Sequence, residues 1–258
     1  MSTTSLLSTQ GLRLAAGERT LCRDLNWQLA PGQCWAIMGL NGAGKTTLLH
    51  TLAGIRRPDQ GEVRLQEQPI HAYSRRHIAQ QVGLLFQESD MVFPGQVLEH
   101  VLIGRHPHLN TWQWESRDDY QIAQHALATV GLSEFAQRDI HTLSGGERQR
   151  MAIATVLAQQ PRVYLLDEPV NHLDWHHQHQ LLATLTGLAH SGSCSLVMAL
   201  HDVNLVARYC DHVLMMFANG DVKMGDCQSL LQTETLSSLY GYEIEQIEAD
   251  GKKVFIPA

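Results

Sequence analysis

Gly39-Leu40-Asn41-Gly42-Ala43-Gly44-Lys45-Thr46-Thr47 is the stretch that decides the fold of this chain. An apolar run at 35–38 precedes it, and apolar residues at helical spacing follow it from 48 to 53. A strand, a loop with the spacing G-x-x-x-x-G-K-T and a helix form the context of a phosphate-binding loop. Glycines let successive N–H groups converge on an anion, and the positive end of the helix dipole adds to them. The alternative is a glycine-rich turn that merely precedes a helix, and the full match in this context disfavours it.

The predicted ligand of this loop is a nucleoside triphosphate with Mg²⁺. Lys45 would reach the β- and γ-phosphates, and the Thr46 hydroxyl would bind the metal. The other positions predicted to bind the nucleotide here are Gly39, Asn41, Gly42, Ala43, Gly44 and Thr47.

Composition limits the class of protein. The 258 residues are 44% hydrophobic, enough for one α/β domain or a core with an added lobe. The net charge of -7 disfavours a general nucleic-acid-binding role. The five cysteines form no C-x-x-C pair, and their odd number argues against a disulfide framework, which favours a reducing compartment. We expect neither a secretory signal nor a membrane-spanning helix, so another polypeptide would supply any membrane span.

The order of patterns predicts an α/β fold in which a phosphate-binding core carries a mainly parallel sheet. Apolar runs at 35–38, 82–86, 163–166 and 195–200 alternate with helical patterns, which is typical of right-handed crossovers in a parallel sheet. Residues 6–30 alternate loosely and predict an N-terminal antiparallel sheet. Residues 88–160 predict an inserted helical lobe, between core segments 1–87 and 161–258 of a single domain spanning 1–258.

The C-terminal part predicts a helical stretch from about 228 and then two short strands. These strands lie around 244–247 and 254–256, and Asp250-Gly251 would form the turn between them.

Polar residues follow three of the buried runs, at the end where parallel sheets bind ligands. They are Gln87, Asp167-Glu168 and His201. Taken singly, Asp167 would be a helix cap, Gln87 a solvated turn and His201 a core histidine. Beside a phosphate-binding loop, they predict a phosphoryl-transfer site.

Each of these residues has a predicted role in that site. Asp167 would hold Mg²⁺, and Glu168 would orient or deprotonate the attacking water. His201 would donate to the γ-phosphate, and Gln87 would contact the metal or the water.

A second candidate anion site begins at Leu143-Ser144-Gly145-Gly146-Glu147-Arg148-Gln149-Arg150. Ser144 and Glu147 have the spacing of a capping box, so one alternative is simply a well-capped helix. The other is that glycine N–H groups and the helix dipole face a phosphate. This stretch lies in the predicted lobe, away from its own phosphate loop, so a second copy of the chain would present it.

Together these residues resemble the nucleotide-binding subunits of ABC transporters over essentially the whole chain. The matching motifs are Walker A at Gly39–Thr46, the Q-loop at Gln87, the signature at Leu143–Gln149, Walker B at Val163–Asp167 with the catalytic carboxylate Glu168, the D-loop Asn171-His172-Leu173-Asp174 and the switch histidine His201. The resemblance implies an ATPase that works as a head-to-tail homodimer. Ser144, Gly145, Gly146 and Asp174 would then contribute to nucleotide binding across the dimer.

Three further stretches resemble type II importers for iron chelates, haem and vitamin B12. They are Gly104-Arg105-His106-Pro107-His108-Leu109, the segment from His201 to Tyr209, and the ending from Leu230 to Gly241. Such importers place their ATPases on the cytoplasmic face of the cell membrane, beneath two permease subunits served by a periplasmic or surface binding protein. Molybdate importers share part of this pattern. A soluble scaffold ATPase, as in iron–sulfur assembly, is the alternative from another class; a non-catalytic regulator and an exporter are disfavoured.

Three further features of the sequence bear on binding of the base, of the permease and of metal ions. Ala16 stands where the family usually has an aromatic residue that stacks on adenine, which predicts weaker selectivity for adenine over guanine. Residues 89–109 would form a groove for a permease helix, with Phe93, Val97 and Val101 as lobe core or docking surface. His172, His176, His177 and His179 are either a solvated cluster or a metal site.

Overall fold

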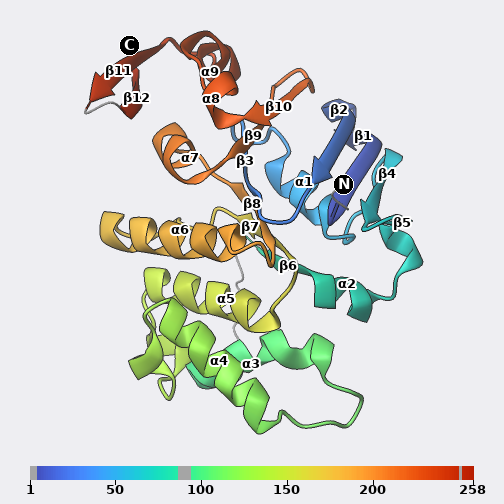
Figure 1. The fold of residues 1–258 in the computed structure, drawn as a ribbon, viewed down its shortest axis with the longest axis vertical. Helices are drawn as coiled ribbons and strands as arrows, with labels where there is room; N and C mark the ends of the chain where they lie inside the picture. The colour runs from blue at the N-terminus through green and yellow to red at the C-terminus, as the bar shows by residue number, and fades with distance from the viewer. Residues whose placement is uncertain (1–4, 87–93, 250–251) are drawn as a thin grey trace.

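The structure is a computed structural model that describes residues 5–86, 94–249 and 252–258. Figure 1 shows two sheets at one end of the molecule and a group of helices at the other. This arrangement confirms the predicted α/β fold with an N-terminal antiparallel sheet and a helical lobe. Gln87 and Phe93 lie outside the described residues.

The central sheet has the order β10-β9-β3-β8-β7-β6. Its strands are β3 (Cys34–Met38), β6 (Val82–Leu85), β7 (Val163–Asp167), β8 (Ser195–Ala199), β9 (His212–Met216) and β10 (Val222–Asp226). All neighbours pair in parallel except β9 and β10. Every residue of β3, β7 and β8 is buried, because both faces of the sheet are covered, and this explains their uninterrupted apolar runs.

The smaller sheet has the order β2-β1-β4-β5 and is antiparallel throughout. It is built from β1 (Leu7–Ala16), β2 (Arg19–Leu29), β4 (Gln60–Leu65) and β5 (Gln68–Pro69). The hydrophobic cluster beneath it also contains α1 (Lys45–Leu52) and one face of β3, through Trp35 and Ile37. The opposite face of β3, through Ala36 and Met38, belongs to the cluster that continues into the lobe.

The lobe consists of α3 (Val97–Leu102), the 3₁₀ segment η2 (Ile103–His108), α4 (Arg117–Thr129) and α5 (Gly145–Gln159), with two further 3₁₀ turns, η3 (Ser133–Phe135) and η4 (Ile140–Thr142). Val97 and Val101 are fully buried, so they belong to the core of the lobe and not to a docking surface.

The remaining elements complete the core. They are η1 (Ile70–Ala72), α2 (Arg75–Gln81), α6 (Trp175–His190), α7 (Val203–Tyr209), α8 (Cys227–Leu230), α9 (Thr233–Tyr240), β11 (Ile244–Ala249) and β12 (Lys252–Pro257). β11 and β12 pair antiparallel, as the sequence predicts, and their predicted turn at Asp250-Gly251 lies outside the described residues.

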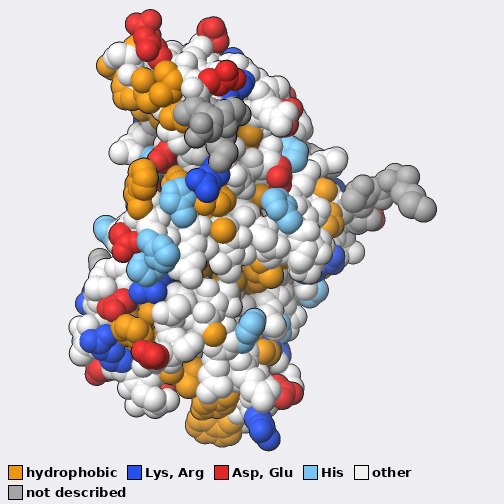
Figure 2. Space-filling view, turned by 60° about the vertical axis from the view of Figure 1, so that its left-hand side comes forward, with side chains coloured by type: hydrophobic (Ala, Val, Ile, Leu, Met, Phe, Trp, Pro, Cys, Tyr) orange, Lys and Arg blue, Asp and Glu red, His pale blue; other side chains and the backbone are white. Residues whose placement is uncertain are grey.

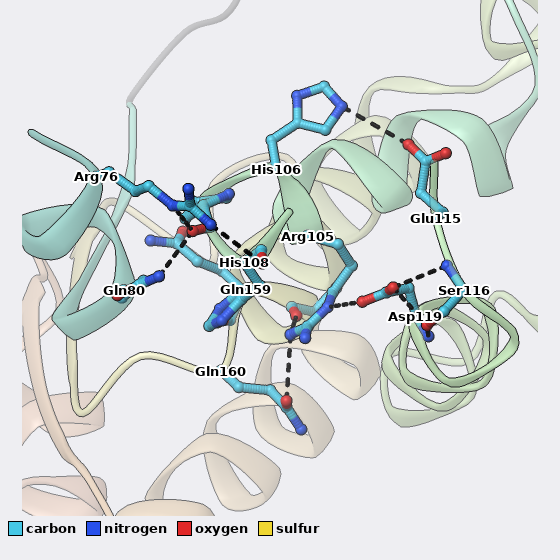
Figure 3. A network of polar contacts seen from close by, with 12 residues as sticks. Arg76, Gln80, Arg105, His106, His108, Glu115, Ser116, Asp119, Gln159 and Gln160 are labelled. Atoms are coloured by element: carbon cyan, nitrogen blue, oxygen red, sulfur yellow. Dashed lines mark hydrogen bonds and ion pairs between the residues drawn. The ribbon is translucent and has the colours of Figure 1, made fainter. Parts of the chain in front are cut away.

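Hydrogen bonds to the η2 segment join the lobe to the core, as Figure 3 shows. Arg76 Nε and Gln80 Nε2, both on α2, donate to the carbonyl of Pro107 at 2.9 and 2.8 Å. A ring nitrogen of His108 donates to the carbonyl of Gln159 at 2.8 Å, which ties η2 to the end of α5. The G-R-H-P-H-L stretch of the sequence is therefore a structural junction between α2 and the lobe.

Arg105 is the buried centre of this junction. Its Nε donates to Asp119 Oδ1 at 2.8 Å, and its Nη1 donates to the carbonyl of Ala158 at 2.8 Å. The Arg105 and Asp119 side chains are each only 9% exposed. Because a buried charge is costly without its partner, this pair fixes η2 against both α4 and α5.

Replacing Asp119 with Asn is expected to lower the free energy of unfolding by about 3 kcal/mol at neutral pH, because the Arg105 charge stays buried without its counter-ion. Hydrogen bonds from Ser116, and then the bond and charge of Arg105, outweigh burial and lower the pKa of Asp119 from 3.8 to about 2. The unfolded chain therefore binds this proton first as the pH falls, so the stabilisation is present above about pH 4 and is lost towards pH 2.

Urea titration at neutral pH and at about pH 3 would measure both effects. Asp118 is the matched control, since it is the exposed neighbour on the same helix turn. Asp118→Asn is expected to cost less than about 0.5 kcal/mol. Equal losses for the two variants would contradict a structural role for the Arg105–Asp119 pair.

Candidate functional site

The predicted phosphate loop connects the end of β3 to the N-terminus of α1. Gly44 adopts φ 107° there, and a Cβ at this position would lie 2.9 Å from the Cβ of Leu21, so only glycine fits. The first turn of α1 holds no acidic residue, and within the described part of the chain no side chain caps it. Its N–H groups are therefore available to an anion, and the helix dipole favours negative charge at this end.

Lys45 lies over this loop. Its Nζ donates to the carbonyls of Gly39 and Leu40 at 2.9 and 3.3 Å, and the residue is only 6% exposed. Burial lowers the pKa of Lys45, whereas the carboxylates of Glu168 and Asp167 oppose that change. The ammonium group is thus placed between the loop and the end of β7, where a triphosphate bound to the loop would meet it.

Asp167 ends β7 with a carboxyl group that is 1% exposed. Among the described residues, neither of its oxygens has a partner at hydrogen-bonding geometry. Burial raises the pKa of Asp167, while the nearby Thr46 hydroxyl favours the ionised form. Buried polar atoms without partners are rare, and hard oxygen ligands suit Mg²⁺, so Asp167 and Thr46 fit the metal that the sequence implies.

Glu168 and His201 meet beside Asp167. Glu168 Oε1 lies 2.7 Å from His201 Nε2, and the side-chain amide of Asn171 donates to Oε2. Burial by itself would raise the pKa of Glu168, but the bonds from His201 and Asn171 outweigh it and lower the pKa below its ordinary value. The carboxylate is therefore ionised at neutral pH and can accept a proton.

The backbone that carries Glu168 is unusual. Glu168 adopts φ 50°, a region that residues other than glycine seldom occupy. The side chain of Gln149, from α5, donates to the carbonyls of Glu168 and Pro169, each at 3.2 Å. Gln149 and Asn171 stand inside motifs quoted from the sequence, but nothing in the sequence assigns them to Glu168.

The second candidate anion site forms the start of α5. Ser144 Oγ accepts from the N–H of Glu147 at 3.3 Å, and Ser144 N–H donates to Glu147 Oε2 at 2.7 Å, which completes a capping box. A Cβ at Gly146 would lie 2.9 Å from the carbonyl of His172, so this turn packs closely against the 171–174 turn of its own chain. Ser144 and Gly145 are exposed to solvent.

Asp174 caps α6 next to this turn. It accepts from the N–H and the ring Nδ1 of His177, both at 2.9 Å, and these bonds lower the pKa of Asp174. His179 Nδ1 lies 2.8 Å from the hydroxyl of Tyr209. Within residues 5–86, 94–249 and 252–258, no three His, Cys, Asp or Glu residues form a group that could hold a metal ion.

Figure 2 turns the left-hand side of Figure 1 forward, and on this face histidine side chains stand beside a few acidic and basic ones.

A hollow of about 470 Å³ lies at the lobe, beside Arg76, His106, Leu109 and Trp114. It adjoins the second half of the segment where the sequence predicts a groove. The indole of Trp114 is 86% exposed.

Ala16 is exposed at the turn between β1 and β2, where it pairs with Arg19. The guanidinium of Arg19 reaches the phosphate loop, with Nη1 3.8 Å from the position that a Cβ on Gly42 would occupy. This turn thus borders the nucleotide site without offering an aromatic ring.

Known proteins that resemble this chain bind ATP, in agreement with the phosphate loop and the residues around it. Residues 22–171 match the family model described as ABC transporter. The petrobactin import ATP-binding protein FpuD of Bacillus anthracis is 37% identical over 95% of this chain and 89% of its own length. The hemin import ATP-binding protein HmuV of Pseudomonas entomophila is 38% identical over 93% of this chain and 94% of its own. A solved structure of a metal-chelate type ABC transporter in an inward-facing conformation has a TM-score of 0.83 at 31% identity, and 98% of each chain is covered.

No helix in the described ranges has the length and apolar character needed to cross a bilayer.

The absence of a ring at Ala16 predicts that the enzyme turns over GTP within about threefold of ATP. Ala16→Tyr is expected to lower the KM for ATP about fivefold with little change in kcat, since an aromatic contact contributes about 1 kcal/mol. Steady-state turnover with both nucleotides would measure this, with Glu18→Tyr at the same exposed turn as the control. A strong preference of the parent enzyme for ATP would contradict the prediction.

Proposed function

This chain belongs to the ABC transporter family as an ATP-hydrolysing, ATP-binding protein, and we propose that it powers an importer for a metal chelate: a corrinoid, a ferric siderophore or haem. The names of the petrobactin and hemin relatives support this cargo class, and so does the metal-chelate type transporter that shares the fold. A molybdate importer and a soluble scaffold ATPase are the alternatives that the experiments below separate.

One observation supports the proposed hydrolytic site. Glu168 Oε1 lies 2.7 Å from His201 Nε2, next to the buried carboxyl group of Asp167, which has no hydrogen-bond partner among the described residues. Glu168 orients the attacking water and takes its proton. His201 would donate a hydrogen bond to the γ-phosphate as negative charge develops there. Lys45 and the N–H groups of the loop hold the phosphates in place, so the chain contributes mainly position and electrostatic stabilisation.

Mg²⁺, when bound, neutralises part of the phosphate charge. Thr46 and Asp167 would hold it, Asp167 through water, and Gln87 would contact the metal or the water. The buried carboxyl group of Asp167, whose oxygens have no partner at hydrogen-bonding geometry within the described ranges, and the nearby Thr46 hydroxyl support this assignment.

The working unit is a head-to-tail homodimer in this proposal. The exposed Ser144 and Gly145, at the N-terminus of α5, would close over the triphosphate held by the loop of the second copy. Gly146 and Asp174 lie at the same surface. The closed dimer therefore completes two nucleotide sites that neither copy has alone.

The dimer would sit peripherally on the cytoplasmic face of the cell membrane, against two copies of a permease subunit. A periplasmic or surface protein would deliver the chelate to that permease, and nucleic acid would play no part. The hollow beside Arg76 and Trp114 supports this arrangement, since a permease segment placed there would contact α2 of the core and the lobe together.

Glu168→Gln is expected to reduce ATP turnover at least about 100-fold, because the group that accepts the proton is lost. ATP binding should persist, and the closed dimer should accumulate. Steady-state hydrolysis and sedimentation with ATP would measure these effects, with the exposed Glu134→Gln as control. Turnover by Glu168→Gln within a factor of two of the parent would exclude Glu168 from this role.

Cells that lack this chain are expected to lose uptake of one chelate among labelled cobalamin, ferric siderophore and haem, and to keep the other two. The parent chain should restore uptake, whereas Glu168→Gln should not. Unchanged uptake of all three chelates would refute the cargo assignment, and loss of molybdate uptake in their place would select the molybdate alternative. Purification without a polytopic membrane protein would favour the scaffold alternative.

A further inference from the structure

The turn that carries His201 is short and connects the buried strand β8 to α7. β8 ends at Ala199, α7 begins at Val203, and Asp202 caps α7 by accepting from the N–H groups of Asn204 and Leu205 at 2.7 and 3.3 Å. Leu200, just before His201, is 2% exposed. The backbone of this turn therefore decides where the His201 ring lies relative to Glu168.

The C-terminal segment, defined as α9, β11 and β12 (233–249 and 252–257), contacts this turn from outside the central sheet. The hydroxyl of Tyr240 donates to the carbonyl of His201 at 3.2 Å, across 39 positions of the chain. Asn204 Nδ2 donates to the carbonyl of Phe255 at 3.0 Å, and the N–H of Phe255 donates to Asn204 Oδ1 at 2.8 Å. Figure 1 shows α7 next to this end of the molecule.

The C-terminal segment is anchored to the core through α9 and β12. Leu236 and Leu239 of α9 and Phe255 of β12 are at most 4% exposed. They belong to the same hydrophobic cluster as Leu200 and Leu205, on either side of His201. Side chains held in a packed cluster lose little further freedom when they form hydrogen bonds, so the contacts of Tyr240 and Asn204 are well positioned to act on the turn.

The Tyr240 hydroxyl is well suited to donate a hydrogen bond, because it stays protonated. Burial, and then the nearby charge of Asp202, raise the pKa of Tyr240 to about 12. Its hydroxyl therefore keeps its proton at neutral pH. Gly241, with φ 67°, ends α9 directly after Tyr240 and fixes the place of this side chain at the helix end.

Two stretches that the sequence marks out, His201 to Tyr209 and the ending up to Gly241, thus meet at one point. We propose that Tyr240 is a positioning residue for ATP hydrolysis: with Asn204, it fixes the backbone of the His201 turn and so sets His201 Nε2 against Glu168. The inference rests on the proposed role of His201 in hydrolysis. It gives the C-terminal segment a function in the ATPase cycle besides completing the core.

Tyr240→Phe removes only the hydroxyl and keeps the ring. It is expected to lower kcat about three- to tenfold, the effect of one hydrogen bond, while the KM for ATP stays within about twofold of the parent. Tyr242→Phe is the matched control, because it also removes a hydroxyl group from the C-terminal segment. The Tyr242 hydroxyl donates to the carbonyl of Ala258 at 2.9 Å and not to that of His201. Tyr242→Phe should leave kcat unchanged, and thermal unfolding would show that both variants are folded.

A double-mutant cycle separates positioning from general loosening. In a His201→Gln background, Tyr240→Phe should have no further effect on the residual turnover, because its route through His201 is gone. A kcat of Tyr240→Phe within 1.5-fold of the parent (about 0.2 kcal/mol) would overturn the inference. The same fractional loss in both backgrounds would overturn it as well.

The outcomes also distinguish this inference from the function on which it rests. If His201→Gln leaves turnover unchanged, both the proposed role of His201 and the inference about Tyr240 are wrong. If His201→Gln reduces turnover but Tyr240→Phe does not, only the inference about Tyr240 is wrong.

Discussion

Parallel pairing of three adjacent strands is the constraint on which the rest of the structure depends. β8 pairs with β3 on one side and with β7 on the other, with Ala199 opposite both Ile37 and Asp167. Since parallel strands end at the same edge, the phosphate loop, Asp167-Glu168 and His201 emerge together, although Gly39 at the start of the loop and His201 are far apart in the sequence. A shift of one position in the pairing of β7 with β8 would send Asp167 to the other face of the sheet.

Burial at that edge of the sheet shifts the pKa values of the polar groups that lie there. Asp167 and Lys45 are almost inaccessible to solvent, and burial disfavours the charged form of each. They offset one another in part, because each charge favours ionisation of the other. Glu168 is kept ionised differently, through direct bonds from His201 and Asn171. Two adjacent carboxyl groups thus acquire different environments, one suited to a cation and one to a proton.

Local patterns in the sequence predict much of this arrangement, and long-range contacts are what they leave out. The glycine loop, the apolar strands and the capping box at Ser144 each depend on neighbouring residues, so they can be recognised from spacing. The sequence does not single out β9, although Val213–Met216 is an apolar run, because no motif follows it. The bonds from Gln149 to Glu168, from Arg105 to Asp119 and from Tyr240 to His201 link distant positions, and no periodicity encodes them. Gln87 lies outside the described residues, so its place in the site stays a prediction.

The helix α5 joins the two halves of the proposed mechanism within one copy. Its N-terminus carries Ser144 and Gly145, which would contact the triphosphate of the second copy. One turn further along, Gln149 holds the carbonyls of Glu168 and Pro169 in its own site. A helix turn is rigid compared with the loops on either side of it. Closure of the dimer over one nucleotide would therefore act, through Gln149, on the backbone that places the carboxylate of the other site, and this gives a physical reason for the two sites to work together.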